Sequence, residues 1–162
     1  MANYFDNIKN APEHVVAESS RLTATGAGHI YDLEMIADTD NGTIVAVGEH
    51  VEGQLFKAEA YAAGKKPYLV LTPPLAYNGK KAWSDEKYFY NAKGEVARAY
   101  ELYVGDIYTV SAKAFDTAPT VGHYVDAEYN VTAEAGANFA GQIIEKVEYT
   151  NSVSYRIRVI KL

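Results

Sequence analysis

The segment Tyr155-Arg156-Ile157-Arg158-Val159-Ile160, close to the end of the chain, alternates apolar and basic side chains from Tyr155 to Val159. Successive side chains of a β-strand point to opposite faces of its sheet, so a period of two gives one buried and one solvated face. The segment therefore predicts a strand that pairs with others near the end of the chain. It also indicates that the fold is built from sheets.

Working outward from this segment, the rest of residues 29–162 has the same character. Short apolar or alternating runs are separated by Gly, Pro, Asn and Asp, which favour turns. The predicted strands lie at residues 43–47, 55–61, 68–71, 102–115, 124–127, 129–132 and 142–149. Many short strands with frequent turns predict an all-β fold, specifically a small antiparallel β-barrel or sandwich.

Two connections look like hairpins. Asp38-Thr39-Asp40-Asn41-Gly42 separates the strand-like residues 30–36 from residues 43–47. Asn-Gly is the strongest short-range hairpin signal because both residues tolerate positive φ. Asn91-Ala92-Lys93-Gly94 similarly separates residues 88–90 from residues 95–100. Only residues 11–22 and residues 93–102 have a composition that also allows a helix.

The first 28 residues differ from the remainder. Tyr4, Phe5 and Ile8 come before Pro12, and residues 19–28 are rich in small side chains. This composition predicts an extended N-terminal arm over residues 1–28, joined by a hinge to a single β-domain over residues 29–162. A first strand paired into the domain, or a tail without structure, is the alternative.

Composition excludes several classes of protein. The 162 residues contain no cysteine, which rules out disulfides and thiolate chemistry, and no apolar run approaches the length of a membrane span. The N-terminus has neither the basic nor the apolar region of an export signal. Residues 1–52 hold nine acidic side chains against Lys9 and Arg21, and no basic cluster appears elsewhere. This charge distribution argues against nucleic-acid binding.

No arrangement of side chains predicts catalysis. The four histidines lack metal-ligand spacing, and no serine lies in a nucleophile motif. Asp38 and Asp40 resemble the start of a calcium loop, but the later ligand positions are missing. Gly26 and Gly28 are followed by strand-like sequence, so no phosphate cradle is predicted. We therefore expect no enzyme activity, no metal and no cofactor.

Several features together resemble the capsid decoration, or cement, proteins of tailed bacteriophages. They are the MANYFDN start, the acidic arm, the Gly-punctuated β-domain and the segment of residues 137–146, Ala-Asn-Phe-Ala-Gly-Gln-Ile-Ile-Glu-Lys. The resemblance implies a structural protein on the outer surface of a virion, assembled in the host cytoplasm. Its partners would be the major capsid protein and further copies of itself, in a homotrimer. Tyr4, Phe5 and Ile8 of the arm would contact the capsid by adding a strand to an exposed sheet edge.

Other functions remain open at this stage. Residues 73–87 form a long loop, and aromatic rings near it suit stacking on sugar rings in a carbohydrate-binding or adhesive module. The rings are those of Tyr77, Trp83, Tyr88 and Tyr90. The simpler interpretation is that Trp83 anchors this loop to the core. Another virion part, such as a tail-tube or head–tail connector protein, is a further alternative.

Overall fold

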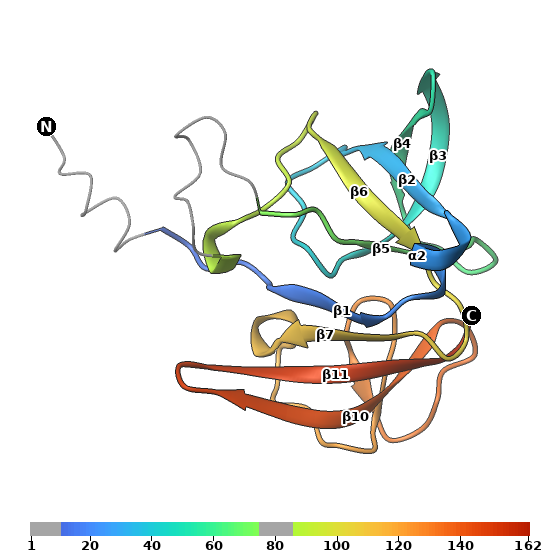
Figure 1. The fold of residues 1–162 in the computed structure, drawn as a ribbon. Coiled ribbons are helices and arrows are strands. Elements are labelled where there is room, and N and C mark those ends of the chain that lie inside the picture. Colours follow the sequence, from blue (N-terminus) through green and yellow to red (C-terminus); the bar gives the residue numbers. More distant parts are fainter. Residues whose placement is uncertain (1–10, 75–85) are drawn as a thin grey trace, which may run out of the picture.

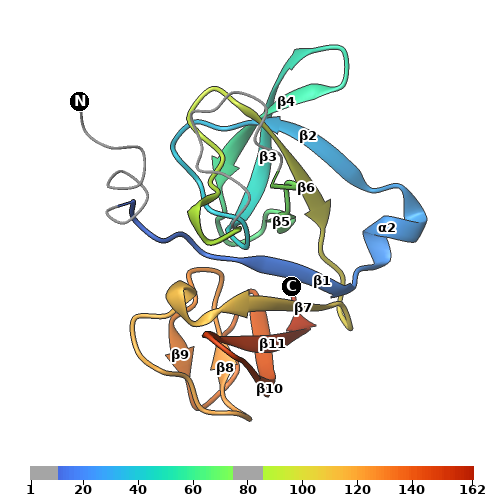
Figure 2. The same cartoon turned by 60° about the vertical axis from the view of Figure 1, so that its left-hand side comes forward.

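The computed structural model describes residues 11–74 and 86–162 of the chain, and its regular structure is almost entirely β (Figure 1). A closed five-stranded barrel lies against a six-stranded sheet, and both views show the barrel on one side of the sheet (Figure 2). The predicted fold class is therefore confirmed.

The barrel uses strands between residues 30 and 101. In the order of their pairing, these are β2 (Ile30–Glu34), β4 (Leu55–Ala60), β3 (Ile44–Glu52), β5 (Tyr68–Val70) and β6 (Val96–Glu101). All neighbours are antiparallel except β2 and β4, which are parallel. Ala97 and Ala99 of β6 are fully buried in the interior beside Leu33. Their small side chains leave room for the larger ones in so narrow a barrel.

The sheet contains the first and the last five of the described strands. Its order is β1 (Ala17–Arg21), β7 (Ile107–Ser111), β11 (Ser152–Lys161), β10 (Ala140–Tyr149), β8 (Tyr124–Val125) and β9 (Val131–Thr132). Strand β11 lies between β7 and β10, and its Tyr155, Ile157 and Val159 are buried while Arg158 is exposed. The alternation in the sequence is thus confirmed as a buried and a solvated face.

Three short helical turns complete the regular structure of the described residues: α2 (Thr23–Ala27), η1 (Glu86–Tyr88) and η2 (Ala112–Ala114). The turn α2 follows β1 directly. The backbone N–H and the hydroxyl of Thr23 both donate to Asp106 Oδ1, at 2.9 and 2.6 Å. Asp106 Oδ2 also accepts from the N–H of Tyr103 at 2.9 Å, and the carboxylate is almost fully buried. One carboxylate therefore fixes α2 to the turn before β7.

Strand β5 separates two apolar cores. Tyr68 and Val70 point into the barrel, whereas Leu69 belongs to a second core that the barrel shares with the sheet. Neither face of β5 meets solvent, which explains the uninterrupted apolar run at this place in the sequence. The second core joins Ile44 and Leu102 of the barrel side to Tyr108 and Ile157 of the sheet.

The predicted hairpin at Asn41-Gly42 is wrong. The turn itself forms, with Gly42 at a φ of 90°. However, β2 pairs with β4 and β6, and β3 pairs with β4 and β5, so the strands on either side of the turn do not meet. The N–H of Gly42 instead donates to the carbonyl of Val70 at 2.8 Å. Pairing with distant strands has overridden the local signal.

Other local predictions are also corrected. Residues 91–94 do not close a hairpin, because β6 pairs with β2 and β5. Residues 17–21 and 96–101, where a helix was allowed, are the strands β1 and β6. Within the predicted arm of residues 1–28, β1 pairs with β7, and Leu22 and Ala24 are buried. Residues 17–27 therefore match the alternative prediction, a first strand paired into the domain, and not an extended arm.

Candidate partner-binding site

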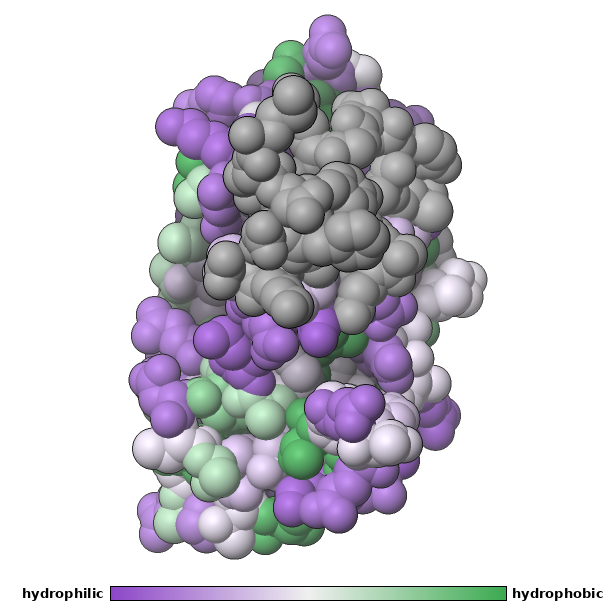
Figure 3. Space-filling model, turned by 90° about the vertical axis from the view of Figure 1, so that its left-hand side faces the viewer, coloured by the Kyte–Doolittle hydropathy of each residue, from purple (hydrophilic) through white to green (hydrophobic). Residues whose placement is uncertain are grey.

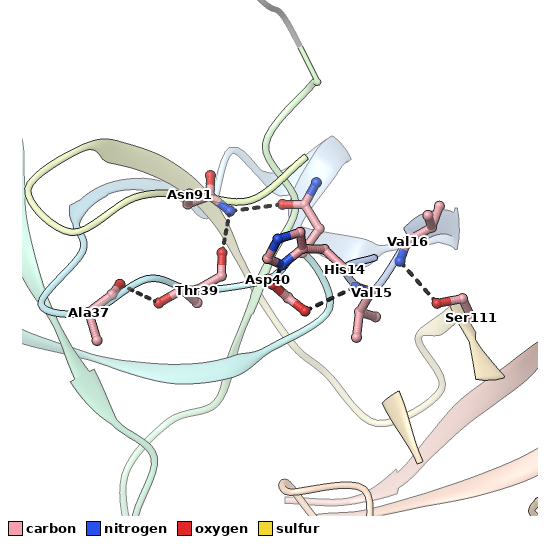
Figure 4. A network of polar contacts seen from close by, with 9 residues as sticks. His14, Val15, Val16, Ala37, Thr39, Asp40, Asn91 and Ser111 are labelled. Atoms are coloured by element: carbon pink, nitrogen blue, oxygen red, sulfur yellow. Dashed lines mark hydrogen bonds and ion pairs between the residues drawn. The ribbon is translucent and has the colours of Figure 1, made fainter. Parts of the chain in front are cut away.

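The described chain begins with a segment that is held in place by specific polar contacts. Nδ1 of His14 lies 2.7 Å from Oδ1 of Asp40, and the backbone N–H of Val15 donates to Oδ2 of the same carboxylate at 2.9 Å (Figure 4). The N–H of Val16 donates to Oγ of Ser111 at 3.0 Å, and its carbonyl accepts from the N–H of Ser111. Residues 14–16, which we call the latch, are thus bonded to both the barrel side and the sheet.

A network of buried amides supports the loop that carries Asp40. The Asn91 side chain donates to the carbonyl of Thr39 at 3.1 Å and to Oδ1 of Asn41 at 3.2 Å (Figure 4). Asn41 in turn exchanges two hydrogen bonds with the backbone of Thr72, at 2.8 and 3.0 Å. Because these buried polar groups satisfy each other, the loop is a rigid support for the latch.

The latch also lies beside the residues that follow the second undescribed segment. The N–H of His14 donates to the carbonyl of Lys87 at 2.6 Å. Its ring stacks on Tyr90, with ring centroids 4.7 Å apart and an angle of 25° between the planes. Residues 1–10 and 75–85 lie outside the described residues, but the positions that adjoin them in sequence meet at this end of the barrel. Figure 3 shows a band of hydrophilic side chains across the middle of this face.

A groove of about 660 Å³ lies between the barrel and the sheet. Its barrel wall comes from residues 36–45 and 58–61, its sheet wall from residues 113–114 and 127–129, and Val15 of the latch lines it as well. Small and apolar side chains alternate with carboxylates along it. This volume falls within the range of pockets that bind ligands.

Tyr129 joins the two walls of the groove. It is the one described non-glycine residue at positive φ, 63°, a conformation that is strained for an aromatic residue. Its buried hydroxyl donates to the carbonyl of Gly42 on the barrel side at 2.5 Å and lies 3.5 Å from the hydroxyl of Tyr108. Strained residues of this kind often mark functional sites.

Sequence reasoning missed a polar cluster at the other end of the barrel. Glu101 is buried, and its Oε1 accepts from Nζ of Lys66 at 2.9 Å while its Oε2 lies 3.2 Å from Nδ1 of His29. The hydroxyl of Tyr103 contacts the same ring nitrogen. The hydrogen bond to Glu101 raises the pKa of Lys66, which favours the charged form of the lysine. These residues come from separate segments, and no local motif could have indicated them.

The residues that the sequence singled out are only partly placed. Tyr4, Phe5, Ile8, Tyr77 and Trp83 lie outside the described residues. Tyr90 is half-buried, and His14 covers one face of its ring. The ammonium group of Lys87 lies 5.0 Å from the centroid of the half-buried Tyr88 ring. These contacts reduce the aromatic area that Tyr88 and Tyr90 could offer to a sugar.

Residues 11–74 and 86–162 contain no candidate metal site and no candidate membrane-spanning helix. In that part of the chain, no three His, Asp or Glu side chains come close enough to hold a metal ion. Nor does any of its helices combine the length and apolarity needed to cross a bilayer.

Comparison with known proteins gives one result. The family model described as YonC prophage protein matches residues 17–160, from the first residue of β1 into β11. No curated protein and no solved structure matches the chain significantly. The match covers most of the sequence and nearly all of the described fold, and the chain therefore belongs to the YonC prophage protein family.

Proposed function

We propose that this prophage protein is a non-enzymatic structural component of a phage particle, which binds the outside of the capsid and bridges major capsid protein subunits. Membership of a prophage family supports a phage origin. The observation that carries the proposal further is the latch. His14 and Val15 are bonded to Asp40 on a rigid loop, and they follow the segment with Tyr4, Phe5 and Ile8 in the sequence.

The chemistry of this segment suits a contact that forms on binding. Three large apolar side chains within five residues can cover an apolar strip or extend an exposed sheet edge. Binding costs conformational entropy wherever it fixes backbone or side chains, and residues 14–16 are already held by the latch. The virion surface is the location that this function requires, after assembly in the host cytoplasm.

Cosedimentation with empty mature capsids tests the proposal. The full chain is expected to pellet with the shells, and a variant that lacks residues 2–10 is expected to lose most of that binding. The cut is placed after residue 10 because β1 pairs with β7 and Leu22 is buried, so a cut after residue 22 would damage the fold.

Two further measurements test how the protein binds and how many copies assemble. Asp40→Ala removes the acceptor of the latch and leaves residues 1–10 intact, so weaker binding by a folded Asp40→Ala protein would implicate the fixed base. Binding that survives deletion of residues 2–10 would remove the segment from the mechanism, and no binding by the full chain would refute the capsid role. The native mass separates a trimer from the sixfold ring expected of a tail-tube or connector protein.

A further inference from the structure

We propose that the second half of β10 pairs with the same segment of a second copy of this chain, so that two sheets join across a twofold axis. The contact is made by residues 145–149, which we call the open edge. The inference goes beyond the proposed function and does not depend on it, because it concerns only contacts between copies of the chain.

The open edge has a strand on one side only among the described residues. From Glu145 to Tyr149, β10 pairs with β11. On its other side, β8 pairs only with Gly141 and Gln142, and the backbone bonds that follow end at Ile143. In Figure 1 the hairpin of β10 and β11 accordingly reaches further to the left than the other strands of the sheet. A strand edge of this kind presents backbone donors and acceptors to which another strand can bond.

The side chains of the open edge leave both faces accessible. Four of the five are exposed, and Val147 is half-buried. A second strand could therefore lie alongside without displacing a described element that covers this part of β10.

Symmetry limits how two identical strands can pair here. In an antiparallel pair, directly opposite residues have their side chains on the same face of the sheet. Two copies related by a twofold axis perpendicular to the sheet therefore pair with one residue opposite its own counterpart. When that residue is Val147, the middle of the open edge, all five of its residues are paired.

The register centred on Val147 also places opposite charges together. It puts Lys146 opposite Glu148 of the second copy, and it does so twice. Within one chain, Nζ of Lys146 lies 2.5 Å from Oε1 of Glu148, so four charges would alternate in sign around the axis. A register centred on Lys146 or on Glu148 would instead put like charges opposite each other, which is unfavourable. The open edge is thus complementary to itself in one register, and this selects a second copy as the partner.

The other face of the open edge adds apolar contact. Tyr149 is 49% exposed and carries its ring on the same face as Val147. In this register the two copies of Val147 are opposite, and Tyr149 is a diagonal neighbour of Val147 in the second copy, within reach of an aromatic ring. Glu145 would lie opposite Tyr149 and keeps its ion pair with Arg156 of its own chain. Four apolar side chains would therefore cover one another.

Charged side chains on an edge strand usually discourage pairing with other proteins. Here a base and an acid occupy the same face two residues apart, so the edge disfavours most strands but accepts its own sequence. A twofold axis joins two copies. This edge therefore accounts for a dimer, and a trimer would need a contact elsewhere.

Charge reversal tests the pairing. In sedimentation velocity, the parent chain is expected to form dimers as its concentration rises. Lys146→Glu and Glu148→Lys should each weaken the dimer at least about tenfold, because like charges then face each other twice. An equimolar mixture of the two variants should restore dimers, since an acidic and a basic edge are complementary. This restoration also shows that both variants are folded.

Lys57→Glu and Glu49→Lys are the matched controls. They reverse the same charges in an exposed ion pair between β4 and β3 of the barrel, whose charged atoms are 3.7 Å apart. Both should leave the association unchanged. A parent chain that stays monomeric would overturn the proposal, and so would an equal loss in Lys146→Glu and Lys57→Glu or a mixture that fails to dimerise.

A cross-link tests the register. The chain contains no cysteine, so Val147→Cys introduces a single thiol. In the proposed dimer the two thiols come from opposite residues whose Cα atoms are about 4.5–5.5 Å apart, a separation that suits a disulfide. Oxidation with diamide should give a covalent dimer on a non-reducing gel. Val153→Cys, at a half-buried position on β11 in the same hairpin, is the control and should cross-link little. Equal cross-linking at both positions would refute this register.

Discussion

Tyr129 illustrates how much a single residue contributes to the contact between barrel and sheet. Its backbone has a φ of 63°, which is unfavourable for a bulky side chain, and its hydroxyl is buried against the Gly42 carbonyl. The ring also packs edge-on against Phe115 at 5.5 Å between centroids. The surrounding contacts therefore hold a conformation that the residue would not adopt by itself.

Tyr129→Phe tests this contact. The change keeps the ring but leaves the buried Gly42 carbonyl without the donor it has now, so unfolding free energy should fall by about 1–3 kcal/mol. Urea unfolding measures the difference. The same substitution at Tyr149, which is 49% exposed, should change stability by less than about 0.5 kcal/mol. Equal effects at both positions would contradict the assigned role of the hydroxyl.

Tyr68 provides a prediction about alkaline pH. Burial, with the negative charge of Glu101, raises the pKa of Tyr68 from 10.0 to about 12. The unfolded chain therefore loses this proton at a lower pH than the folded protein does. The contribution of Tyr68 to the free energy of unfolding is fully present below pH 10 and is lost as the pH rises towards 12.

Tyr68→Phe removes this titration, so the variant should lose less stability than the parent over that interval. Urea unfolding at a series of pH values gives both curves, and tyrosinate absorbance of the folded protein follows the ionisation. Tyr149→Phe, at an exposed position, is the control and should leave the slope unchanged. Parallel curves for Tyr68→Phe and the parent would show that Tyr68 does not contribute.

Single residues also show where sequence reasoning reached its limit. Asn41 and Gly42 correctly predicted a turn, because the preference for positive φ is local. The turn did not determine which strands pair. Asn41 is bonded to Thr72 and Gly42 to Val70, and these distant partners hold the turn away from a hairpin. Residues about 30 positions away in the chain contribute these partners, and no window around the turn contains them.

At the scale of elements, β10 and β11 are the longest described strands, with ten residues each, and they pair along almost their whole length. Gly141 of β10 pairs with Val159 at a shift in register, and a Cβ added to Gly141 would lie 2.5 Å from Cγ2 of Ile157. It would also lie 3.2 Å from Cγ2 of Val125 on β8. The glycine therefore allows three strands to approach one another where a side chain does not fit.

Gly141→Ala should consequently destabilise the protein by about 1–3 kcal/mol, since Ile157 and Val125 must move to make room. Thermal unfolding with circular dichroism is a suitable measurement. Gly136→Ala is the control, because its added Cβ meets no atom within 4 Å and its φ is not positive. A variant at position 141 that is as stable as the control would show that the strands have room to separate.

The sequence predicted most strands but not their arrangement. Alternation identified β11 and the apolar run identified β5, because each pattern reflects which faces of the strand are buried. These local patterns could not indicate the parallel pairing of β2 with β4, and they did not identify β1 as a strand. Four of the five residues of β1 are exposed, so it lacks the burial pattern that identifies strands. The groove was likewise missed, because its two walls are 50 or more residues apart in the chain.

In the whole molecule, barrel and sheet depend on each other. Leu33 lies in the barrel core and Ile157 in the core shared with the sheet, and both are fully buried. Leu69 of β5 belongs to the shared core while its neighbours Tyr68 and Val70 fill the barrel. Loss of either core should therefore weaken the other.

Leu33→Ala and Ile157→Ala should each reduce stability by about 2–5 kcal/mol through lost burial and the cavity that remains. Each variant is expected to unfold in one transition, with near-ultraviolet and far-ultraviolet circular dichroism changing together. Ile36→Ala, at an exposed position, is the control and should have little effect. Two separate transitions in either core variant would show that barrel and sheet unfold independently.

The pairing of β1 with β7 has a consequence for synthesis of the protein. Ala17 lies opposite Val110, and Ser19 opposite Tyr108, so the partner of β1 comes about ninety residues later in the chain. While the ribosome makes the barrel strands, β1 has no neighbour in its sheet. Pairing over such a distance slows folding, because a long loop must close first. The N-terminal part of the nascent chain therefore stays open to chaperones and proteases until the second half of the protein has emerged.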